Sequence, residues 1–230
     1  MKWLFWKDFR HNLPIVIFGL ILLLLPHLFA LWGMYLQANS GSKLPWQDNF
    51  VMSSLWAFIL SQLTVAVASG NAIAGERADR SAEFLGSLPI ARRKILASKL
   101  LFALAIIAAI WVTTGLMVWG LVRTDPTVIH LFARSAGEML CAFAAVAISG
   151  AAIFGPAWFL SSLAASPTIA VCAGLATPLT VWLGVLFVHS LFGPDKIDVG
   201  LGLWYAGVCL TLGIAGFVAG TWYYLRRVEP

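Results

Sequence analysis

The chain alternates between long apolar runs and short polar connections. Six runs carry almost no charge, and each is long enough to cross the hydrocarbon core of a bilayer, about 30 Å thick, as an α-helix. They are residues 13–36, 50–74, 97–122, 136–163, 168–192 and 201–225. Helices are expected because backbone groups within lipid must be paired inside their own segment. The runs also lack the polar–apolar alternation of barrel strands.

This pattern predicts an all-α polytopic membrane protein. Residues 13–230 form one six-helix transmembrane domain, and residues 1–12 precede it as an amphipathic interfacial helix. On a helical wheel Phe5, Trp6, Phe9 and Leu13 share one face, and the polar residues Lys7, Asp8, Arg10 and His11 point elsewhere. Such a helix lies along the membrane surface with its basic residues near anionic headgroups. The alternative is an ordinary cytoplasmic extension of the first span. Separately, Asn12 can cap the start of that span.

Prolines and glycines mark special points within the spans. Pro26 predicts a bend in the first span, and Gly155-Pro156 predicts a break or kink in the fourth. The pair Gly216-x-x-x-Gly220 in the sixth span permits close approach of another helix. That helix belongs either to the same subunit or to a second copy at a dimer seam.

Composition agrees with a membrane protein rather than a soluble domain. Apolar residues make up 60% of the chain and charged residues 11%, with a mean hydropathy of +0.88. The net charge of +5 reflects membrane topology rather than a nucleic-acid partner. Cys141, Cys172 and Cys209 lie in apolar runs, so we expect packing roles and neither a disulfide framework nor a metal site.

The positions of lysine and arginine predict the orientation. With a cytoplasmic N-terminus, eleven of these residues fall on the cytoplasmic side and four on the other. Cytoplasmic segments of membrane proteins carry such an excess. We therefore expect a multi-pass protein of the cell (inner) membrane with both termini and the loop of residues 76–96 in the cytoplasm.

A charged island between the second and third spans, residues 75–99, is the main functional signal. Charges at mid-bilayer cost roughly 2.5–3.5 kcal/mol each, so the island lies in water or against protein. Its charged residues are Glu76, Arg77, Asp79, Arg80, Glu83, Arg92, Arg93, Lys94 and Lys99. Asp79 or Ser81 can cap a short helix on which Leu85 and Leu88 form an apolar stripe. A plain basic loop explains the arginines but not this leucine pattern.

The island resembles that of the permease subunits of type-2 ABC exporters. The matching residues are Gly75, Glu76, Glu83, Leu85, Leu88, Pro89, Ile90, Arg92, Arg93 and Lys99. Arg80-Ser81 stands where that family often has glycine–threonine. The resemblance implies a cytoplasmic coupling helix that docks on a separate ATPase subunit. The residues expected at that contact are Glu76, Arg80, Ser81, Glu83, Leu85, Leu88, Pro89, Arg92 and Arg93.

The same resemblance implies a non-catalytic chain. No G-x-x-x-x-G-K-[S/T] phosphate loop occurs in the sequence, so ATP and Mg²⁺ are expected in the partner ATPase subunits. A second permease subunit, identical or related, completes the pathway, and by family analogy spans one, two and five face the central seam. An ATPase-driven membrane scaffold that moves no substrate is the alternative.

Four further polar residues lie within or near the spans. Gln62 and Asn71 either line a substrate path or form interhelical hydrogen bonds. His27 and His189 are candidate ligands of a haem or metal, which would make the chain an intramembrane redox subunit. Without a His/Cys cluster, an interfacial or proline-associated structural role is the preferred interpretation of both histidines.

Overall fold

A computed structural model describes residues 2–40, 46–79, 91–124, 136–192 and 199–227. These residues form seven α-helices and no strand. The helices are α1 (Lys2–His11), α2 (Leu13–Ser40), α3 (Trp46–Ala78), α5 (Arg92–Thr124), α7 (Ala136–Leu163), α8 (Pro167–Phe192) and α9 (Val199–Arg227). All but α1 are long and apolar enough to cross a membrane, which confirms the six predicted spans.

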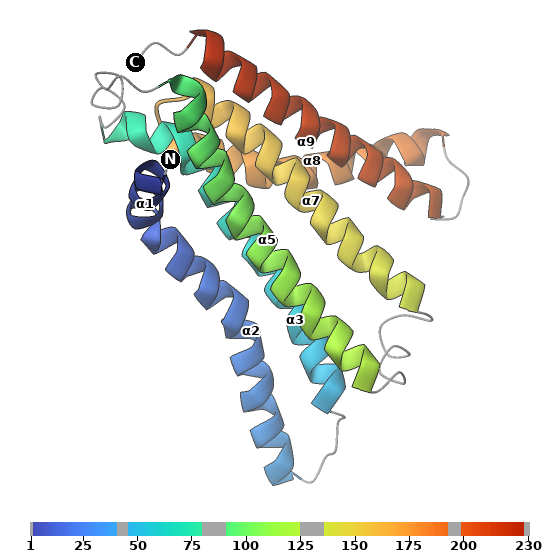
Figure 1. Ribbon diagram of the computed structural model, residues 1–230. Helices are drawn as coiled ribbons and strands as arrows, with labels where there is room; N and C mark the ends of the chain where they lie inside the picture. Colours follow the sequence, from blue (N-terminus) through green and yellow to red (C-terminus); the bar gives the residue numbers. More distant parts are fainter. Residues whose placement is uncertain (1, 41–45, 80–90, 125–135, 193–198, 228–230) are drawn as a thin grey trace.

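In the fourth span, α7 continues through Gly155 and Pro156, so the break that the sequence offered as an alternative to a kink does not occur. Proline is tolerated within membrane helices when neighbouring helices hold the chain in place. Here α7 is supported by α3, α8 and α9, which all pack against it. The first span behaves as predicted: α2 contains Pro26 and curves in its middle third (Figure 1).

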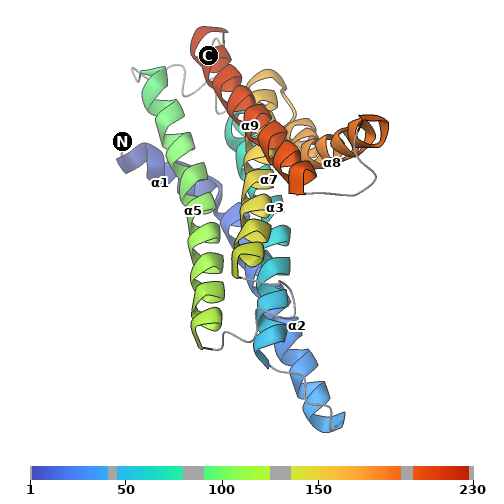
Figure 2. The same cartoon turned by 90° about the vertical axis from the view of Figure 1, so that its right-hand side faces the viewer.

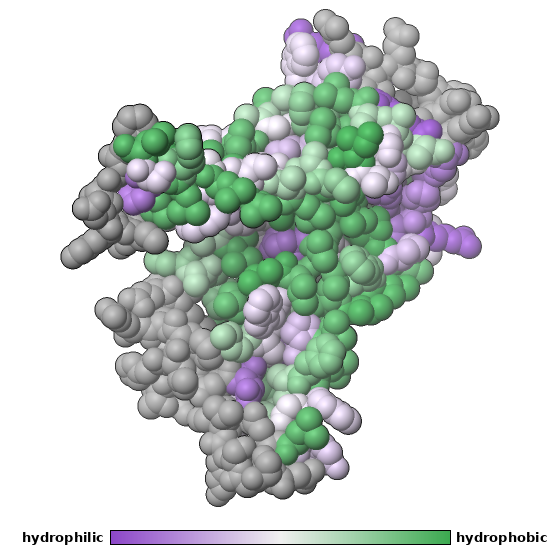
Figure 3. All heavy atoms as spheres, turned by 180° about the vertical axis from the view of Figure 1, so that it is seen from behind, coloured by the Kyte–Doolittle hydropathy of each residue, from purple (hydrophilic) through white to green (hydrophobic). Residues whose placement is uncertain are grey.

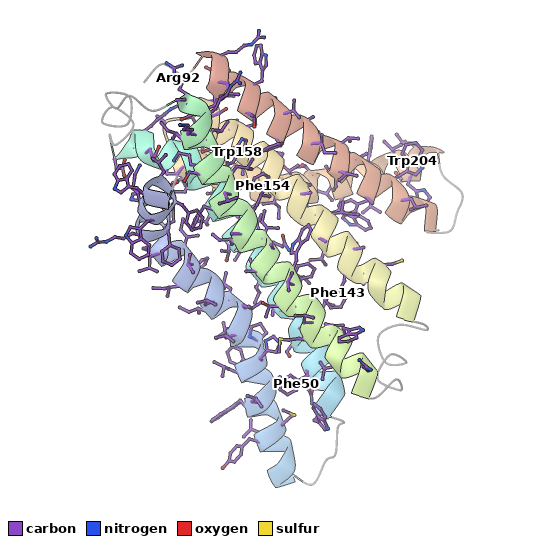
Figure 4. The ribbon with its side chains drawn as sticks, in the orientation of Figure 1. Phe50, Arg92, Phe143, Phe154, Trp158 and Trp204 are labelled. Atoms are coloured by element: carbon purple, nitrogen blue, oxygen red, sulfur yellow. The ribbon has the colours of Figure 1, made fainter. Side chains whose placement is uncertain are left out.

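Helix α3 lies at the centre of the bundle and packs against α2, α5, α7 and α8 (Figures 1 and 2). The aromatic core follows the long axis of the molecule, with Trp158 and Phe154 near one end, then Phe143 and Phe50 (Figure 4). Trp158 is fully buried and stacks on Phe154 with ring centroids 5.5 Å apart. The central span therefore contacts four other spans, so a displacement of α3 would change its packing against each of them.

Helices α7 and α9 approach each other closely at their glycines. A methyl group at Gly216 would lie 2.6 Å from the carbonyl carbon of Gly155, and one at Gly220 would lie 2.8 Å from Cα of Phe159. These distances are shorter than any normal carbon–carbon contact, so the two backbones require glycine at this crossing. The motif of the sixth span thus packs within the subunit, which decides between the two alternatives that the sequence left open.

Apolar side chains cover the middle of the rear face of the molecule (Figure 3). Hydrophilic side chains collect toward the end where α1 lies, and this end also receives the C-terminus of α9 (Figures 1 and 3). Figure 2 shows α1 lying across the direction of α5. Such a helix suits the membrane surface rather than its interior.

Candidate functional site

The two ends of the charged island meet at the end of the bundle that carries α1. Helix α3 ends at Ala78 and α5 begins at Arg92, and both points lie at this end (Figure 1). The predicted coupling-helix residues Arg80, Ser81, Glu83, Leu85, Leu88 and Pro89 lie outside the described residues. The structure describes the residues on either side of that segment, up to residue 79 and from residue 91.

The C-terminal end of α3 bends away from the rest of the helix (Figure 1). Gly70, about two turns before this end, lies directly against Val171 of α8. Beyond it, the hydroxyl of Ser161 in α7 accepts hydrogen bonds from the backbone amides of Ile73 and Ala74, at 3.0 and 2.9 Å. A side chain inserted beside the hydrogen-bond ladder of a helix is a recognised cause of such a bend.

Glu76, on the bent part of α3, binds two lysines at once. Its Oε1 lies 2.8 Å from Nζ of Lys7 in α1, and its Oε2 lies 2.8 Å from Nζ of Lys99 in α5. The side chain of Glu76 is 9% exposed and that of Lys99 is 5% exposed. Lys99 also donates to the carbonyl oxygen of Ala72, at 2.6 Å. One buried carboxylate therefore connects three helices.

A second buried carboxylate lies on α1. Asp8 accepts a hydrogen bond of 2.6 Å from the hydroxyl of Ser98, the residue before Lys99. Leu4, one turn earlier, is also buried, while Trp3 and Trp6 are exposed. Helix α1 therefore turns two of its polar residues, Lys7 and Asp8, toward the protein, which the wheel did not predict. Trp6, on the predicted apolar face, is exposed. We call Lys7, Asp8, Glu76, Ser98 and Lys99 the charge cluster.

The turn between α1 and α2 is bonded to the same part of α3. Asn71 Nδ2 donates to Oδ1 of Asn12 at 3.1 Å, and Asn12 Nδ2 donates to the carbonyl oxygen of Asp8 at 2.8 Å. The side chain of Asn12 thus joins two helices, instead of acting only as the predicted cap of the first span. A methyl group at Gly75 would overlap the side chain of Asn71. Glycine is needed there to leave room for this hydrogen bond.

Arg77 extends the connections to the far side of the bundle. Its guanidinium donates to the carbonyl oxygens of Ser162 at 2.7 Å and Ala164 at 3.5 Å. These carbonyls belong to the end of α7 and the connection to α8, where helical carbonyls lack partners within their own helix. The end of α3 is therefore bonded to α1, α5 and α7 by side chains.

The charge cluster contains two lysines and two carboxylates, so its formal charges balance. Burying ions costs several kcal/mol each, and their attraction offsets this only when the geometry is good and every polar atom is bonded. Here both oxygens of Glu76 are paired. Such a cluster adds little net stability over an apolar core, but it penalises any arrangement in which one helix moves away from the others.

Three residues predicted to contact the ATPase are described by the structure, and they differ in exposure. Glu76 is turned inward, and both of its oxygens are occupied within the subunit. Arg92 and Arg93 are exposed at the start of α5. The wheel placed Lys7 and Asp8 away from the apolar face of α1 but did not connect them with Glu76 and Lys99.

Neither Gln62 nor Asn71 is among the residues that line the groove described between α2 and α3. Gln62 is buried against Gly150 of α7, and its Nε2 donates to the carbonyl oxygen of Phe58 in its own helix. Its Oε1 has no hydrogen-bond partner among the described residues.

A groove of about 320 Å³ lies between α2 and α3. Its lining is Leu25, Pro26, Phe29, Ala30, Asn49, Ser53, Trp56 and Leu60. The polar residues of this groove, Asn49 and Ser53, were not among the predicted candidates.

The two histidines lie on separate helices. His27 is buried, with Nδ1 3.0 Å from the carbonyl oxygen of Leu23 and Nε2 3.3 Å from the hydroxyl of Ser54. His189 lies near the C-terminal end of α8, which is on the far side of the bundle from α2 in both views (Figures 1 and 2). Within the described part of the chain, no three His, Cys, Asp or Glu residues are grouped as metal ligands would be.

Comparison with known proteins identifies a family. A family model described as ABC-2 family transporter protein matches residues 3–195. The match includes α1, the charge cluster and five of the six spans. Comparisons with curated proteins and with solved structures give no match.

Proposed function

Because the chain belongs to the ABC-2 family of transporter proteins, we propose that it is the permease subunit of an ATP-driven exporter. Membership of this family implies association with an ABC ATPase, and the family's membrane components are generally non-catalytic. Separate ATPase subunits bind ATP and Mg²⁺, grip residues 80–90, and move the spans of this subunit. A second permease subunit, identical or related, completes the path.

One observation carries the coupling role: Glu76 binds Lys99 across the base of the loop and Lys7 at the same time. A force on residues 80–90 then acts on α3 and α5 together, because Glu76, four residues before this segment, is joined to Lys99, nine residues after it. Lys7 passes the displacement to α1, and Arg77 passes it to the end of α7.

The direct test is to identify what touches the loop. The full chain, with Cys141 and Cys172 replaced by serine, receives a single new cysteine by Glu83→Cys and is purified from its own cells in mild detergent after cross-linking. We expect a cross-link to a nucleotide-binding ATPase. Arg123→Cys, at the other end of α5, is the control and should give none. Failure of any ATPase to cross-link or co-purify would refute the proposal.

A further inference from the structure

A pocket of about 410 Å³ lies between the start of α5 and the end of α9, at the end of the bundle that is predicted to face the cytoplasm. It is lined by Ala91, Arg92, Arg93, Trp222, Leu225 and Arg226. Figure 4 places Arg92 at the start of α5, at the end of the bundle where α9 finishes. The volume falls within the roughly 300–1,000 Å³ typical of small-ligand sites.

The lining of this pocket is strongly cationic. It carries three guanidinium groups, and no carboxylate occurs among its described lining residues. Like charges around one cavity repel each other, so an anion placed between them is favoured. Guanidinium groups match phosphate oxygens with paired, charge-assisted hydrogen bonds. Phosphate is therefore the anion that this lining suits best.

Part of the pocket is ordered before any ligand arrives. The guanidinium of Arg226 stacks on Trp222, with its central carbon 5.1 Å from the ring centroid. Leu225, beside it, packs against the main hydrophobic core. Less side-chain freedom is lost on binding when the cationic group already has a fixed place.

The surroundings of the pocket point to a lipid. Tryptophan and arginine at the end of a span mark the level of the lipid headgroups, and Trp222 is half-exposed. Most of α9 faces outward, since 17% of its membrane window is buried within the protein. Basic pockets between the ends of membrane helices bind anionic headgroups. Acyl chains would then lie along the apolar outer surface of α9.

We propose that this pocket binds the phosphate of an anionic phospholipid from the leaflet in which α1 lies. The site uses Arg92, Arg93 and Arg226, with Trp222 positioning Arg226 and contacting the glycerol region. It does not depend on the role of the charge cluster or on the identity of an ATPase. A bound lipid would bridge α5 and α9 at their ends.

The experiment compares three forms of the purified full chain in detergent: the natural protein, the triple variant Arg92→Gln/Arg93→Gln/Arg226→Gln, and Arg123→Gln. Arg123 stacks on Trp119 at 5.3 Å at the opposite end of α5, so it is a matched arginine–tryptophan pair outside the pocket. Retained lipid is counted by native mass spectrometry after titration with phosphatidylglycerol or phosphatidylcholine. The triple variant should bind phosphatidylglycerol at least about tenfold more weakly, since each basic residue adds to the attraction. Arg123→Gln should bind like the natural protein, and phosphatidylcholine should bind all three forms weakly and equally.

Three results would overturn the proposal. Equal retention of phosphatidylglycerol by the natural protein and the triple variant would show that the pocket is not the lipid site. Full competition by inorganic phosphate at equal concentration would assign the pocket to free phosphate. Unchanged lipid binding together with loss of a co-purifying ATPase would assign these arginines to a protein contact.

Discussion

Glu76 holds two lysines, so its loss leaves two cations without their counter-charge, and one of them, Lys99, is almost fully buried. Removing one partner of a buried ion pair typically costs about 3–5 kcal/mol, because the remaining charge stays desolvated. We therefore expect Glu76→Gln to lower the unfolding temperature of the detergent-solubilised protein clearly. Circular dichroism at 222 nm during heating measures this.

The double variant Glu76→Gln/Lys99→Gln separates this charge effect from a general disturbance. It removes the buried cation as well, so it should lose less stability than the sum of the two single variants. Asp79→Asn is the exposed control: Asp79 lies 3.5 Å from His11, and both side chains are about two-fifths exposed. Exposed pairs contribute about 0–1 kcal/mol, so this change should matter little. Additive losses in the double variant would contradict the assignment.

At the same scale, the sequence marked Glu76 and Lys99 as charged residues that needed water or a partner. It did not show that they bind each other, because that requires α3 and α5 to meet at one level. Lys7 lies 69 residues from Glu76, and no local spacing connects them. Its inward direction follows from how α1 docks, with Leu4 and Asp8 buried, which a helical wheel of an isolated segment does not contain.

At the scale of helices, the crossing of α7 and α9 makes a sharp prediction. Gly216→Ala adds a methyl group 2.6 Å from the backbone of Gly155, so the helices must separate. Overpacking of this kind typically costs about 1–3 kcal/mol. We expect a lower unfolding temperature and earlier aggregation on heating, measured by size-exclusion chromatography of heated samples.

Gly207→Ala, in the same helix, is the matched control for that crossing. A methyl group at Gly207 meets no atom within 4 Å, and alanine favours helix over glycine. This variant should be as stable as the natural protein or slightly more so. Equal losses in both glycine variants would contradict close packing as the reason for glycine at this crossing, because Gly207 has no close neighbour.

A second prediction for a helical element concerns the loop above the charge cluster. Glu83→Ala and Leu88→Ala change the predicted coupling helix. Each variant should insert into the membrane, and its complex should still hydrolyse ATP, but hydrolysis should no longer move the spans. In a Cys172→Ser background, an environment-sensitive fluorophore on the exposed Cys141 reports movement at the far end of α7, because Cys209 is buried. We expect an ATP-dependent fluorescence change in the parent complex and none in the variants. A normal change in both variants would refute coupling through these residues.

The positions of the helices were predicted well, because hydropathy determines them. Their local shape was predicted poorly, because contacts with other helices determine it. All six spans were found from their apolar runs. The bend at the end of α3 was not, because its cause is Ser161, which lies 88 residues from Ile73. The break that was one of two expectations at Pro156 does not occur: α7 continues through it, with α3, α8 and α9 packed against it. Periodicity and propensity describe one helix at a time, and both departures arise from contacts between helices.

For the whole molecule, the arrangement of the ends gives a test of function. Both ends of the island, α1 and the end of α9 lie at one end of the bundle (Figure 1). The excess of lysine and arginine predicts that this end is cytoplasmic. Single cysteines introduced by Glu83→Cys and Asp195→Cys, in the background with Cys141 and Cys172 replaced by serine, test this in intact cells with a membrane-impermeant maleimide.

We expect Asp195→Cys to react in intact cells and Glu83→Cys to react only after the membrane is permeabilised. Residue 195 lies between α8 and α9, so five spans separate it from the N-terminus, whereas two spans separate residue 83 from it. The two sites must therefore label from opposite sides in any orientation. Labelling of position 83 in intact cells would place the loop outside the cell, where no cytoplasmic ATPase reaches it. The coupling role of the loop would then fail, although the family membership and the six spans would stand.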